Sequence, residues 1–421
     1  MSSLIYKKKI LHFSGMDLSD LAKGNKTPFF VYSEDILVHN YTSFYEGAKK
    51  AGIRKPLVCF AMKSNPNKEL VSILADLGSG ADIVSGGELK RALEAGIPSE
   101  KIVFSGVGKT KEEIDYALTV SKKGIFSFNV ESLEELELIN ECAKKHKREA
   151  RICFRLNPVV KALTHKNIST GNKTHKFGLL EKDVYDSLGK AKYWSHSKLV
   201  GLSVHIGSQL LDLKATKKAV IKLCEVALKT KAPLEFLDVG GGLGVDYHPS
   251  ESSKMPAIDD YMTLVSTTLE KYYYTKTDNV PRVVFEPGRR IVAKAGIFVM
   301  SVLRNKISEK NHFLIVDGGM NDFMRPSLYG AYHGLTPVKE AKNATNCHVV
   351  GPICETSDCF GSDRKLPKMS AGELLVLEDT GAYGYSMGSN YNLRGRPLEI
   401  LINKKKKIKT INKAQPYEDL T

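Results

Sequence analysis

The sequence predicts an α/β fold in which a parallel (β/α)8 barrel is combined with a mostly antiparallel β domain. Two observations support this prediction. Short apolar segments alternate with amphipathic stretches from about residue 57 to residue 290, and beyond residue 290 the alternation gives way to β-type segments with few helices between them. Alternating strands and helices are typical of a parallel sheet, and the length of the region is close to the ~250 residues of a (β/α)8 barrel.

The residues before the barrel are expected to be extended. Apolar segments lie at 5–11 and 28–32, and a helical stretch begins at 33–35 and runs to about Lys50. Because an isolated pair of strands is only marginally stable, we expect residues 1–35 to join the β domain. The predicted domains are therefore a barrel over 36–290 and a β domain made of 1–35 and 291–421.

The barrel is predicted from eight apolar, β-rich segments and the helical stretches between them. The strands are expected at 57–62, 81–84, 101–105, 126–130, 150–156, 199–206, 235–239 and 281–285. The helices are expected at 67–77, 87–95, 111–120, 132–146, 213–229 and 258–273. One connection, residues 158–181, is long and polar, and loops of this length are more often functional than idle.

The β domain is predicted from apolar segments that follow one another without intervening helical periods. They lie at 296–302, 313–316, 373–377 and 398–402. Four lysines, 404–407, separate the last of these from another β-type segment at 408–411. We interpret the lysine run as the solvated tip of a hairpin.

Composition restricts the class of protein. The chain has 421 residues, of which 42% are hydrophobic and 26% charged, and this is ordinary for a globular protein. No apolar run approaches the ~20 residues of a membrane helix, and the N-terminus lacks the apolar core of a signal peptide, so we expect a cytoplasmic protein without a membrane partner. The 7 cysteines are scattered without a C-x-x-C pair, which favours reduced thiols and no metal site.

The formal net charge of +15 raises the question of a nucleic-acid partner. The lysines are dispersed over predicted helix faces, and no cluster combines aromatic with basic residues. We therefore expect no nucleic-acid partner. A positive field could instead attract an anionic cofactor or substrate.

Lys63 is the central residue of the sequence, because it follows the apolar segment 57–62 at the point where that strand should end. The ordinary interpretation is a lysine whose chain extends to the rim of the barrel. The alternative is a desolvated amine that forms a Schiff base with an aldehyde cofactor. The other groups that reach the same rim decide between the two.

Every predicted strand ends in polar residues or glycine. In chain order the strand ends contain Lys63, Asp82 with Glu88, residues 105–109, residues 129–132, Arg155, His205 with Ser208, residues 238–244, and Glu286 with Gly288 and Arg289. The carboxyl ends of the strands of a (β/α)8 barrel meet at one rim, which carries the active site. One such end could be a structural turn, but eight together favour a functional site.

Three of these strand ends suggest particular roles. Residues 240–244 read Gly-Gly-Gly-Leu-Gly, and Val245 occupies the place where a dinucleotide fingerprint needs glycine, so a phosphate-binding loop remains. Glu286 could pair with Arg289 or Arg290, or it could hold a protonated pyridine nitrogen. His205 is either a core histidine or a ring that stacks on a planar cofactor.

Taken together, the segments Phe60–Asn65 and His205–Gln209, the triple glycine and Glu286–Arg289 resemble the pyridoxal-phosphate-dependent decarboxylases of basic amino acids that share the alanine racemase fold, also called fold type III. The resemblance covers nearly the whole chain, including the β domain. It implies pyridoxal 5'-phosphate as cofactor, a Schiff base at Lys63 and a homodimer with active sites shared between subunits.

The resemblance also implies roles for the other residues at the rim. His205 is expected to stack on the cofactor ring, Glu286 to hold its pyridinium nitrogen, and the triple glycine with Tyr383 to bind the phosphate. The further residues expected at the cofactor are Asp82, Glu88, Arg155, Ser208, Gly240, Gly241, Gly242, Gly288 and Arg289.

Within this family the chain is most similar to members that decarboxylate meso-2,6-diaminopimelate to L-lysine and carbon dioxide. The far end of this substrate carries both charges. Arg289, Arg325 and Tyr329 are expected to bind its carboxylate, and Glu355 its ammonium. Tyr383 is expected at the substrate as well.

Cys354 has two interpretations. It could be a plain buried small residue, or a thiol that returns a proton after decarboxylation. The resemblance implies the second role, with Cys354 contributed by the partner subunit. One departure from the family pattern is His175, where serine is common, and it affects only the long loop.

Three alternatives are left open. A decarboxylase of ornithine, arginine or D-configured basic amino acids needs only an acidic group at the far end of its substrate. A racemase of this fold places an arginine opposite the pyridine nitrogen, so Glu286 argues against that activity. A non-catalytic cofactor carrier usually lacks the β domain and its Cys-Glu pair.

Overall fold

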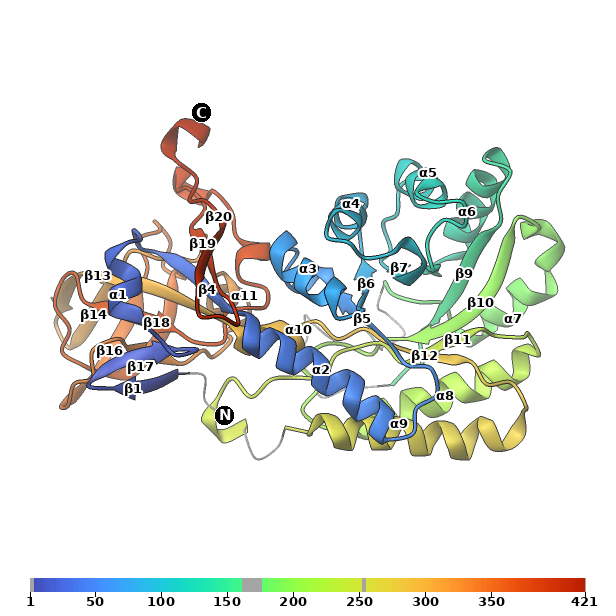
Figure 1. The fold of residues 1–421 in the computed structure, drawn as a ribbon, viewed down its shortest axis with the longest axis horizontal. Coiled ribbons are helices and arrows are strands. Elements are labelled where there is room, and N and C mark those ends of the chain that lie inside the picture. The colour runs from blue at the N-terminus through green and yellow to red at the C-terminus, as the bar shows by residue number, and fades with distance from the viewer. Residues whose placement is uncertain (1–3, 161–175, 252–254, 421) are drawn as a thin grey trace. The chain divides into compact units, whose positions relative to one another are not determined.

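Eight parallel strands close into a barrel in the computed structural model, which describes residues 4–160, 176–251 and 255–420 (Figure 1). They are β5 (Leu57–Ala61), β6 (Gly80–Ile83), β7 (Ile102–Phe104), β8 (Ser127–Val130), β9 (Ala150–Leu156), β10 (Ser197–Val204), β11 (Phe236–Asp238) and β12 (Arg282–Phe285). Each strand pairs with the next one along the chain, and β12 closes the barrel against β5. The predicted (β/α)8 barrel is confirmed, with strand limits within two residues of those expected.

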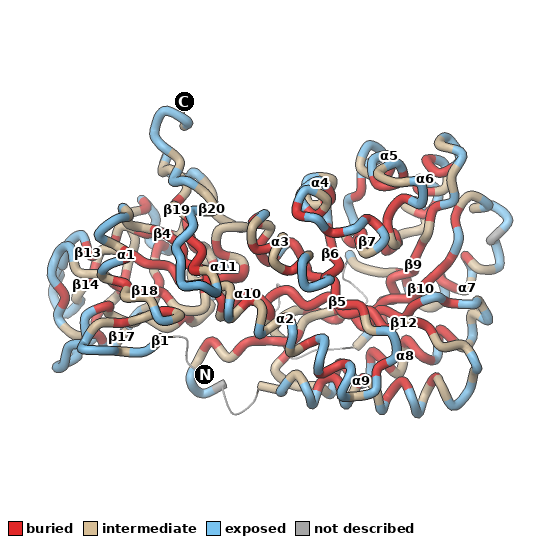
Figure 2. Tube along the Cα trace, viewed as in Figure 1, coloured by how far each residue is buried: buried red, intermediate tan, exposed pale blue. Residues whose placement is uncertain are grey.

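The barrel strands are apolar because both of their faces are buried, as Figure 2 shows for β5 and β12. Their inner faces supply a buried cluster of Leu57, Cys59, Val103, Cys153, Val200, Phe236 and Val284. The polar residues stand where these strands end. The register pairs Ala61 with Asp82 and Ser203 with Asp238, so the strand ends lie next to one another.

Helices follow the strands, and side-chain caps begin several of them. The predicted helices are confirmed as α3 (Lys68–Asp76), α4 (Gly86–Glu94), α5 (Lys111–Thr119), α6 (Leu133–Lys145), α8 (Lys214–Thr230) and α9 (Ile258–Tyr272). Asn67, Ser85, Thr110 and Ser132 accept hydrogen bonds from backbone N–H groups in the first turns of α3 to α6. Each cap ends a short loop that begins at the barrel rim, which holds those loops in place.

The long connection was predicted over 158–181, and residues 161–175, which include His175, lie outside the described part. A helix that was not predicted, α7 (Glu181–Gly189), follows it.

The β domain is built on a mixed, mostly antiparallel sheet. Its strand order is β17 (Cys359–Pro367), β16 (Ala344–Val350), β14 (Asn311–Val316), β13 (Gly296–Ser308), β4 (Phe29–Ser33), β19 (Leu398–Ile402) and β20 (Ile408–Asn412), with β18 (Leu374–Leu377) and β15 (Leu335–Pro337) branching from β13. β4 lies between β13 and β19 and is buried along its whole length. Lys404–Lys407 connect β19 to β20, so the predicted hairpin tip is confirmed.

The first residues of the chain are only partly extended. β1 (Leu4–Lys7), β2 (Ile10–Phe13) and β3 (Met16–Asp17) form a small sheet. A short helix, α1 (Leu18–Lys23), follows, so the expectation of an extended segment is wrong there. The Asp17 side chain accepts from two N–H groups of the first turn, and Leu18 and Leu21 are buried, which explains the helix.

The chain divides into two compact units. The barrel unit consists of Tyr41–Val245 and Ser253–Arg289, and the β unit of Met1–Asn40, Asp246–Ser252 and Arg290–Thr421. Helix α2 (Glu34–Lys50) runs from one unit into the other.

Candidate active site

Lys63 lies at the mouth of β5. The strand ends at Ala61, and Met62–Ser64 form a single 3-10 turn in which the Ser64 hydroxyl donates to the Ala61 carbonyl at 2.7 Å. This turn carries the Lys63 Nζ to 3.2 Å from Oδ2 of Asp82, at the end of β6. The lysine side chain is 40% exposed and the aspartate 1% exposed. The amine is therefore accessible and is held by a buried carboxylate.

Three buried carboxylates gather near this amine: Asp82, Asp238 and Glu286. Burial, followed by repulsion from Asp238 and Asp82, raises the pKa of Glu286 well above its ordinary value. Burial also raises the pKa of Asp238 to about 7. Oδ1 of Asp82 and Oδ2 of Asp238 are buried and have no hydrogen-bond partner among the described residues. Burial and mutual repulsion therefore favour the protonated, neutral forms of Asp238 and Glu286, and a bound cation would favour their ionised forms.

Glu286 is held by an amide. The Asn129 side chain donates to Oε1 of Glu286 at 3.4 Å and to the Ser105 hydroxyl at 3.0 Å. Among the described contacts of the barrel unit, Glu286 forms no ion pair with an arginine, so these contacts give no support to a pairing with Arg289. The Arg289 guanidinium instead donates from Nε and Nη2 to the Ser208 hydroxyl, at 3.3 and 3.0 Å.

His205 follows β10 and is oriented by the glycine loop. The Gly241 N–H donates to Nδ1 of His205 at 3.2 Å, so Nδ1 carries no proton. Burial, with the charges of Arg155 and Lys63, lowers the pKa of His205 well below its ordinary value. The ring is therefore neutral, with its proton on Nε2.

The triple glycine is required by the closeness of neighbouring strand ends. A Cβ at Gly240 would lie 2.3 Å from the Val204 carbonyl oxygen, and one at Gly241 would lie 2.0 Å from that of Glu286. A Cβ at Gly242 would lie 2.2 Å from the Gly207 carbonyl oxygen. The loop therefore packs directly on the ends of β10 and β12, which no larger residue would allow.

The amides of this loop are not equivalent. The Gly240 N–H donates to Oδ1 of Asp238 at 2.8 Å, and the Gly241 N–H is used by His205. The described contacts give the Gly242 N–H no acceptor. Gly288 completes the same region, because its Cβ position lies 3.0 Å from Ala61 and Ser64.

Arg155 and Glu88 also lie at the rim, each with a partner inside the protein. Nη1 of Arg155 forms a 2.6 Å ion pair with Oε1 of Glu131, which also accepts from the Gly106 N–H at 3.1 Å. Oε2 of Glu88 accepts from the Val84 N–H at 2.8 Å, and burial raises the pKa of Glu88 to about 7. These contacts fix the polar wall around Lys63.

Sequence reasoning gave no role to Asp238, Asn129 or Glu131, although all three stand at predicted strand ends. The signal was present in Phe128-Asn129-Val130, where Asn129 interrupts a buried strand, and in Phe236-Leu237-Asp238, where Asp238 is the buried last residue of its strand. A buried polar group inside a barrel strand needs a partner at the rim, and this requirement could have identified them.

The β unit carries the other predicted residues in two groups. Arg325 and Tyr329 lie on the short helix α11 (Arg325–Tyr329), and Arg325 is buried. The Arg325 guanidinium carbon lies 5.0 Å from the ring centroid of Tyr247 and 6.0 Å from that of Tyr329.

Cys354 and Glu355 form the second group, on a turn before β17. Cys354 is exposed, so the interpretation of a plain buried cysteine is wrong. Its backbone N–H donates to Oδ1 of Asn392 at 2.9 Å, and Oε1 of Glu355 accepts from the Tyr391 hydroxyl at 2.5 Å. Tyr383 is half-buried in a separate turn, with a left-handed φ of 57°.

Other classes of site receive no support. In the described part of the chain, no group of three or more His, Cys, Asp or Glu residues could hold a metal ion. No helix among those residues is long and apolar enough to cross a membrane. The seven cysteines are all free thiols.

Comparisons with known proteins agree with this site. A family model described as "Pyridoxal-dependent decarboxylase, pyridoxal binding domain" matches residues 43–293. The chain is 40% identical to a diaminopimelate decarboxylase of Aquifex aeolicus, over 99% of this chain and 96% of the relative. It is 42% identical to a diaminopimelate decarboxylase of Helicobacter pylori, over 95% of this chain and 96% of the relative.

Solved structures give the same result. The H. pylori diaminopimelate decarboxylase complexed with L-lysine superposes with a TM-score of 0.88 at 41% identity, covering 96% of this chain and 98% of that one. The Methanocaldococcus jannaschii diaminopimelate decarboxylase in complex with L-lysine gives a TM-score of 0.93 at 37% identity, covering 99% of this chain and 96% of that one.

Proposed function

The chain belongs to the diaminopimelate decarboxylases of the pyridoxal-dependent decarboxylase family, and we propose which of its residues carry out their reaction. The enzyme removes one carboxylate from meso-2,6-diaminopimelate and releases L-lysine and carbon dioxide, the last step of lysine biosynthesis, with pyridoxal 5'-phosphate as cofactor. The observation that carries the assignment is the barrel rim, where an accessible lysine, three buried carboxylates and a glycine loop meet.

The residues at the rim fit this cofactor. The cluster of buried carboxyl groups suits a cationic ring, the Gly242 N–H and the Ser208 hydroxyl suit a phosphate, and the Lys63 amine suits an aldehyde. When bound, pyridoxal 5'-phosphate supplies an aldehyde for the substrate amine and a ring that accepts the electron pair left by carbon dioxide. The family model over 43–293 supports the proposal that 36–290 form the cofactor-binding domain, and that 1–35 with 291–421 form the β domain.

Two residues hold the cofactor ring in its reactive state. Glu286 would hold the ring nitrogen in its protonated form, because a cation there would offset the burial and repulsion that favour the neutral form of Glu286. His205 stays neutral and presents a flat face to the ring, in an orientation that the Gly241 N–H fixes. Asp82 holds the Lys63 amine between turnovers.

The phosphate is held by the glycine loop, Ser208, Gly288 and Arg289. Of the three glycine amides, the Gly242 N–H is the one offered to the phosphate, since those of Gly240 and Gly241 serve Asp238 and His205. Tyr383 is a further residue in our proposal for phosphate binding.

The substrate is recognised by the second set of residues. Arg325, Tyr329 and Arg289 bind the distal carboxylate, and Glu355 binds the distal ammonium. The Cys354 thiol returns a proton to the carbon that has lost its carboxylate. Tyr383 contributes to the substrate site as well.

We also propose an assembly and a location. The chain acts as a homodimer in which Cys354 and Glu355 of one copy complete the site of the other, in the cytoplasm. An exposed Cys354 and Glu355 support such sharing, because they are accessible to a second copy.

Carbon dioxide release from meso-2,6-diaminopimelate tests the proposal. We expect one carbon dioxide and one L-lysine per substrate consumed, dependent on added pyridoxal 5'-phosphate, and much slower release from ornithine or arginine. Absence of release by the cofactor-loaded protein, or equal release from ornithine, would contradict the assignment. Mixing a Cys354→Ala variant with a Lys63→Ala variant tests site sharing, because a mixed dimer should regain part of the activity.

A further inference from the structure

His333 is a buried histidine that has no role in the reaction proposed above. It lies in the segment after α11 and its side chain is fully buried. Nε2 of His333 accepts a hydrogen bond from Nε of Arg325 at 3.3 Å. Its Nδ1 lies 2.8 Å from the Glu378 carbonyl oxygen. The imidazole therefore bridges the Arg325 side chain and the backbone beside β18.

These two partners determine the tautomer of the ring. A carbonyl oxygen only accepts, so Nδ1 of His333 carries the proton and donates to Glu378. A guanidinium only donates, so Nε2 carries no proton and accepts from Arg325. His333 is thus a neutral imidazole that receives a charge-assisted hydrogen bond.

Aromatic rings enclose the pair. The Tyr247 ring lies 4.6 Å from the His333 ring and also faces the Arg325 guanidinium. Phe323 packs edge-on against His333 at 4.7 Å, with an interplanar angle of 87°. The Tyr329 ring also lies near the Arg325 guanidinium, and together these rings restrict its orientations.

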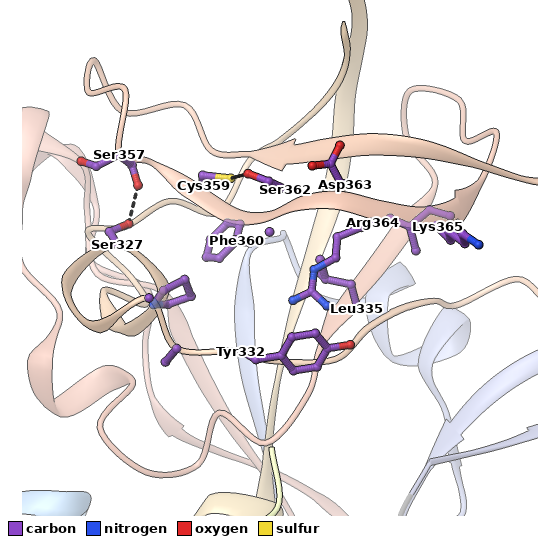
Figure 3. A pocket seen from close by; sticks show the side chains of 15 residues that line it. Ser327, Tyr332, Leu335, Ser357, Cys359, Phe360, Ser362, Asp363, Arg364 and Lys365 are labelled. Atoms are coloured by element: carbon purple, nitrogen blue, oxygen red, sulfur yellow. Dashed lines mark hydrogen bonds between the residues drawn. The ribbon is translucent and has the colours of Figure 1, made fainter. Parts of the chain in front are cut away.

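The backbone of His333 is held from the other side by Arg364 of β17. Nη2 of Arg364 donates to the His333 carbonyl oxygen at 2.8 Å, and its guanidinium carbon lies 3.8 Å from the Tyr332 ring centroid. Figure 3 shows Arg364 and Tyr332 on the wall of a cavity of about 750 Å³ beside α11. The segment that carries His333 is therefore clamped between β17 and β18.

We propose that His333 is a positioning residue that orients the Arg325 guanidinium for the distal carboxylate of the substrate. This inference rests on the proposed role of Arg325 in substrate binding. It adds that the preference for a substrate with a carboxylate at its far end depends on a neutral imidazole with its proton on Nδ1. Through Arg325, His333 acts on substrate binding and not on the chemical step.

Two substitutions separate the two hydrogen bonds of His333. Asparagine places an amide near the position of Nδ1, so His333→Asn keeps a donor for Glu378 and loses the acceptor for Arg325. Glutamine reaches the position of Nε2, so His333→Gln keeps an acceptor for Arg325. The ligands are L-lysine, which has the distal carboxylate, and 1,5-diaminopentane, which lacks it, each titrated into the cofactor-loaded enzyme.

We expect His333→Asn to weaken L-lysine binding by about 10- to 100-fold, which is the effect of losing one hydrogen bond to a charged group. The same variant should weaken 1,5-diaminopentane binding by less than about 2-fold. His333→Gln should stay within about 5-fold of wild type for both ligands. With meso-2,6-diaminopimelate, His333→Asn should raise KM and leave kcat nearly unchanged. An equal loss for both ligands, or an equal loss in the two variants, would overturn the inference.

Two further measurements keep the inference testable. In the Arg325→Ala background, His333→Asn should cost no further L-lysine affinity, because it acts through Arg325. The 15N spectrum of histidine-labelled wild-type enzyme, assigned by comparison with His333→Gln, should show a neutral ring with Nδ1 protonated. An imidazolium, or a proton on Nε2, overturns the inference.

The Arg325→Ala variant shows whether a failed prediction refutes the proposed role of Arg325 or only that of His333. If it does not favour 1,5-diaminopentane over L-lysine relative to wild type, the proposed role of Arg325 is wrong. If it does and His333→Asn does not, only the role of His333 is wrong.

Discussion

Two buried arginines, one in each unit, are held by different kinds of partner. In the barrel unit, Arg155 forms a 2.6 Å ion pair with the buried carboxylate of Glu131, and its guanidinium carbon lies 4.9 Å from the Phe177 ring. In the β unit, the described partners of Arg325 are the neutral imidazole of His333 and the rings of Tyr247 and Tyr329. The charge of Arg155 is compensated inside the protein, whereas these partners of Arg325 carry none.

The difference corresponds to two tasks. A guanidinium bound to a carboxylate has a structural role. Here the ion pair of Arg155 with Glu131 fixes the polar residues around Lys63. A hydrogen bond from a guanidinium to a neutral imidazole, like that of Arg325 to His333, orients the guanidinium without neutralising its charge. The barrel unit thus carries the residues proposed to bind the cofactor, which every substrate of the family requires. The β unit carries residues proposed to select among substrates.

Of the variants proposed here, Lys63→Ala should have the largest effect on activity, and it tests whether the barrel unit binds the cofactor covalently. We expect kcat to fall by at least ~10³-fold, because the variant has no amine to hold the cofactor covalently. After borohydride treatment, mass spectrometry should find the cofactor attached to wild type and not to the variant. Lys101→Ala, which removes a lysine that binds the Gly78 carbonyl elsewhere in the barrel unit, should keep the adduct. Cofactor that remains covalently attached in Lys63→Ala would exclude Lys63.

Arg155→Ala tests the comparison of the arginines directly. The change leaves Glu131 buried without its ion pair, so we expect the free energy of unfolding to fall by about 3–5 kcal/mol. Arg325→Ala leaves the buried Nε2 of His333 without its donor and should cost about 1–3 kcal/mol. Urea unfolding of the two variants provides the measurement. L-Lysine affinity should show the reverse order, and equal effects of both variants on both properties would remove the distinction.

Glu286→Gln tests whether the carboxylates of the barrel serve the cofactor ring. Glutamine keeps the size of the side chain and the contact with Asn129, but it cannot balance a protonated ring nitrogen. We expect kcat to fall by about 10²- to 10³-fold, with the cofactor still bound. Glu235→Gln, at an exposed ion pair with Arg151 in the same unit, should have little effect. An unchanged kcat in Glu286→Gln would mean that another group holds the nitrogen.

The barrel could be predicted from the sequence because one physical rule repeats in it. A strand buried on both faces must be apolar throughout, and the residue after it faces the rim, so β5 and Lys63 could be identified from the pattern alone. Short helices were missed, among them α1 and α11, because caps and tertiary contacts stabilise them and no long periodic pattern marks them.

The roles of individual polar residues were harder to predict than the fold. Asp238 was visible at a strand end, but its effect on Glu286 depends on a neighbouring strand. His333 acquires its tautomer from Glu378, 45 residues away in the chain. Pattern reasoning locates the residues that face a site. It does not give the partner that fixes the protonation state of each one.

Asp238→Asn should have the smallest effect of these variants, and it is the most specific test of the cluster formed by Asp82, Asp238 and Glu286. Burial raises the pKa of Asp238 from its ordinary value to about 7, so the folded protein holds this proton more tightly than the unfolded chain. Between about pH 4 and pH 7, the unfolded chain loses the proton first, and stability falls as pH rises. Asparagine cannot titrate and still accepts from the Gly240 N–H.

Relative to wild type, the cofactor-free Asp238→Asn variant should therefore gain about 1–3 kcal/mol in unfolding free energy between pH 5 and pH 8. Urea unfolding at the two pH values measures this gain. Asp186→Asn, at an exposed position on α7, should show no such gain. Loading wild type with pyridoxal 5'-phosphate should reduce the difference, because a cationic ring compensates the same charge. Parallel pH profiles for wild type and Asp238→Asn would show that the folded protein does not hold the Asp238 proton more tightly than the unfolded chain does, and the contrast between the two units would then rest on Arg155 and Arg325 alone.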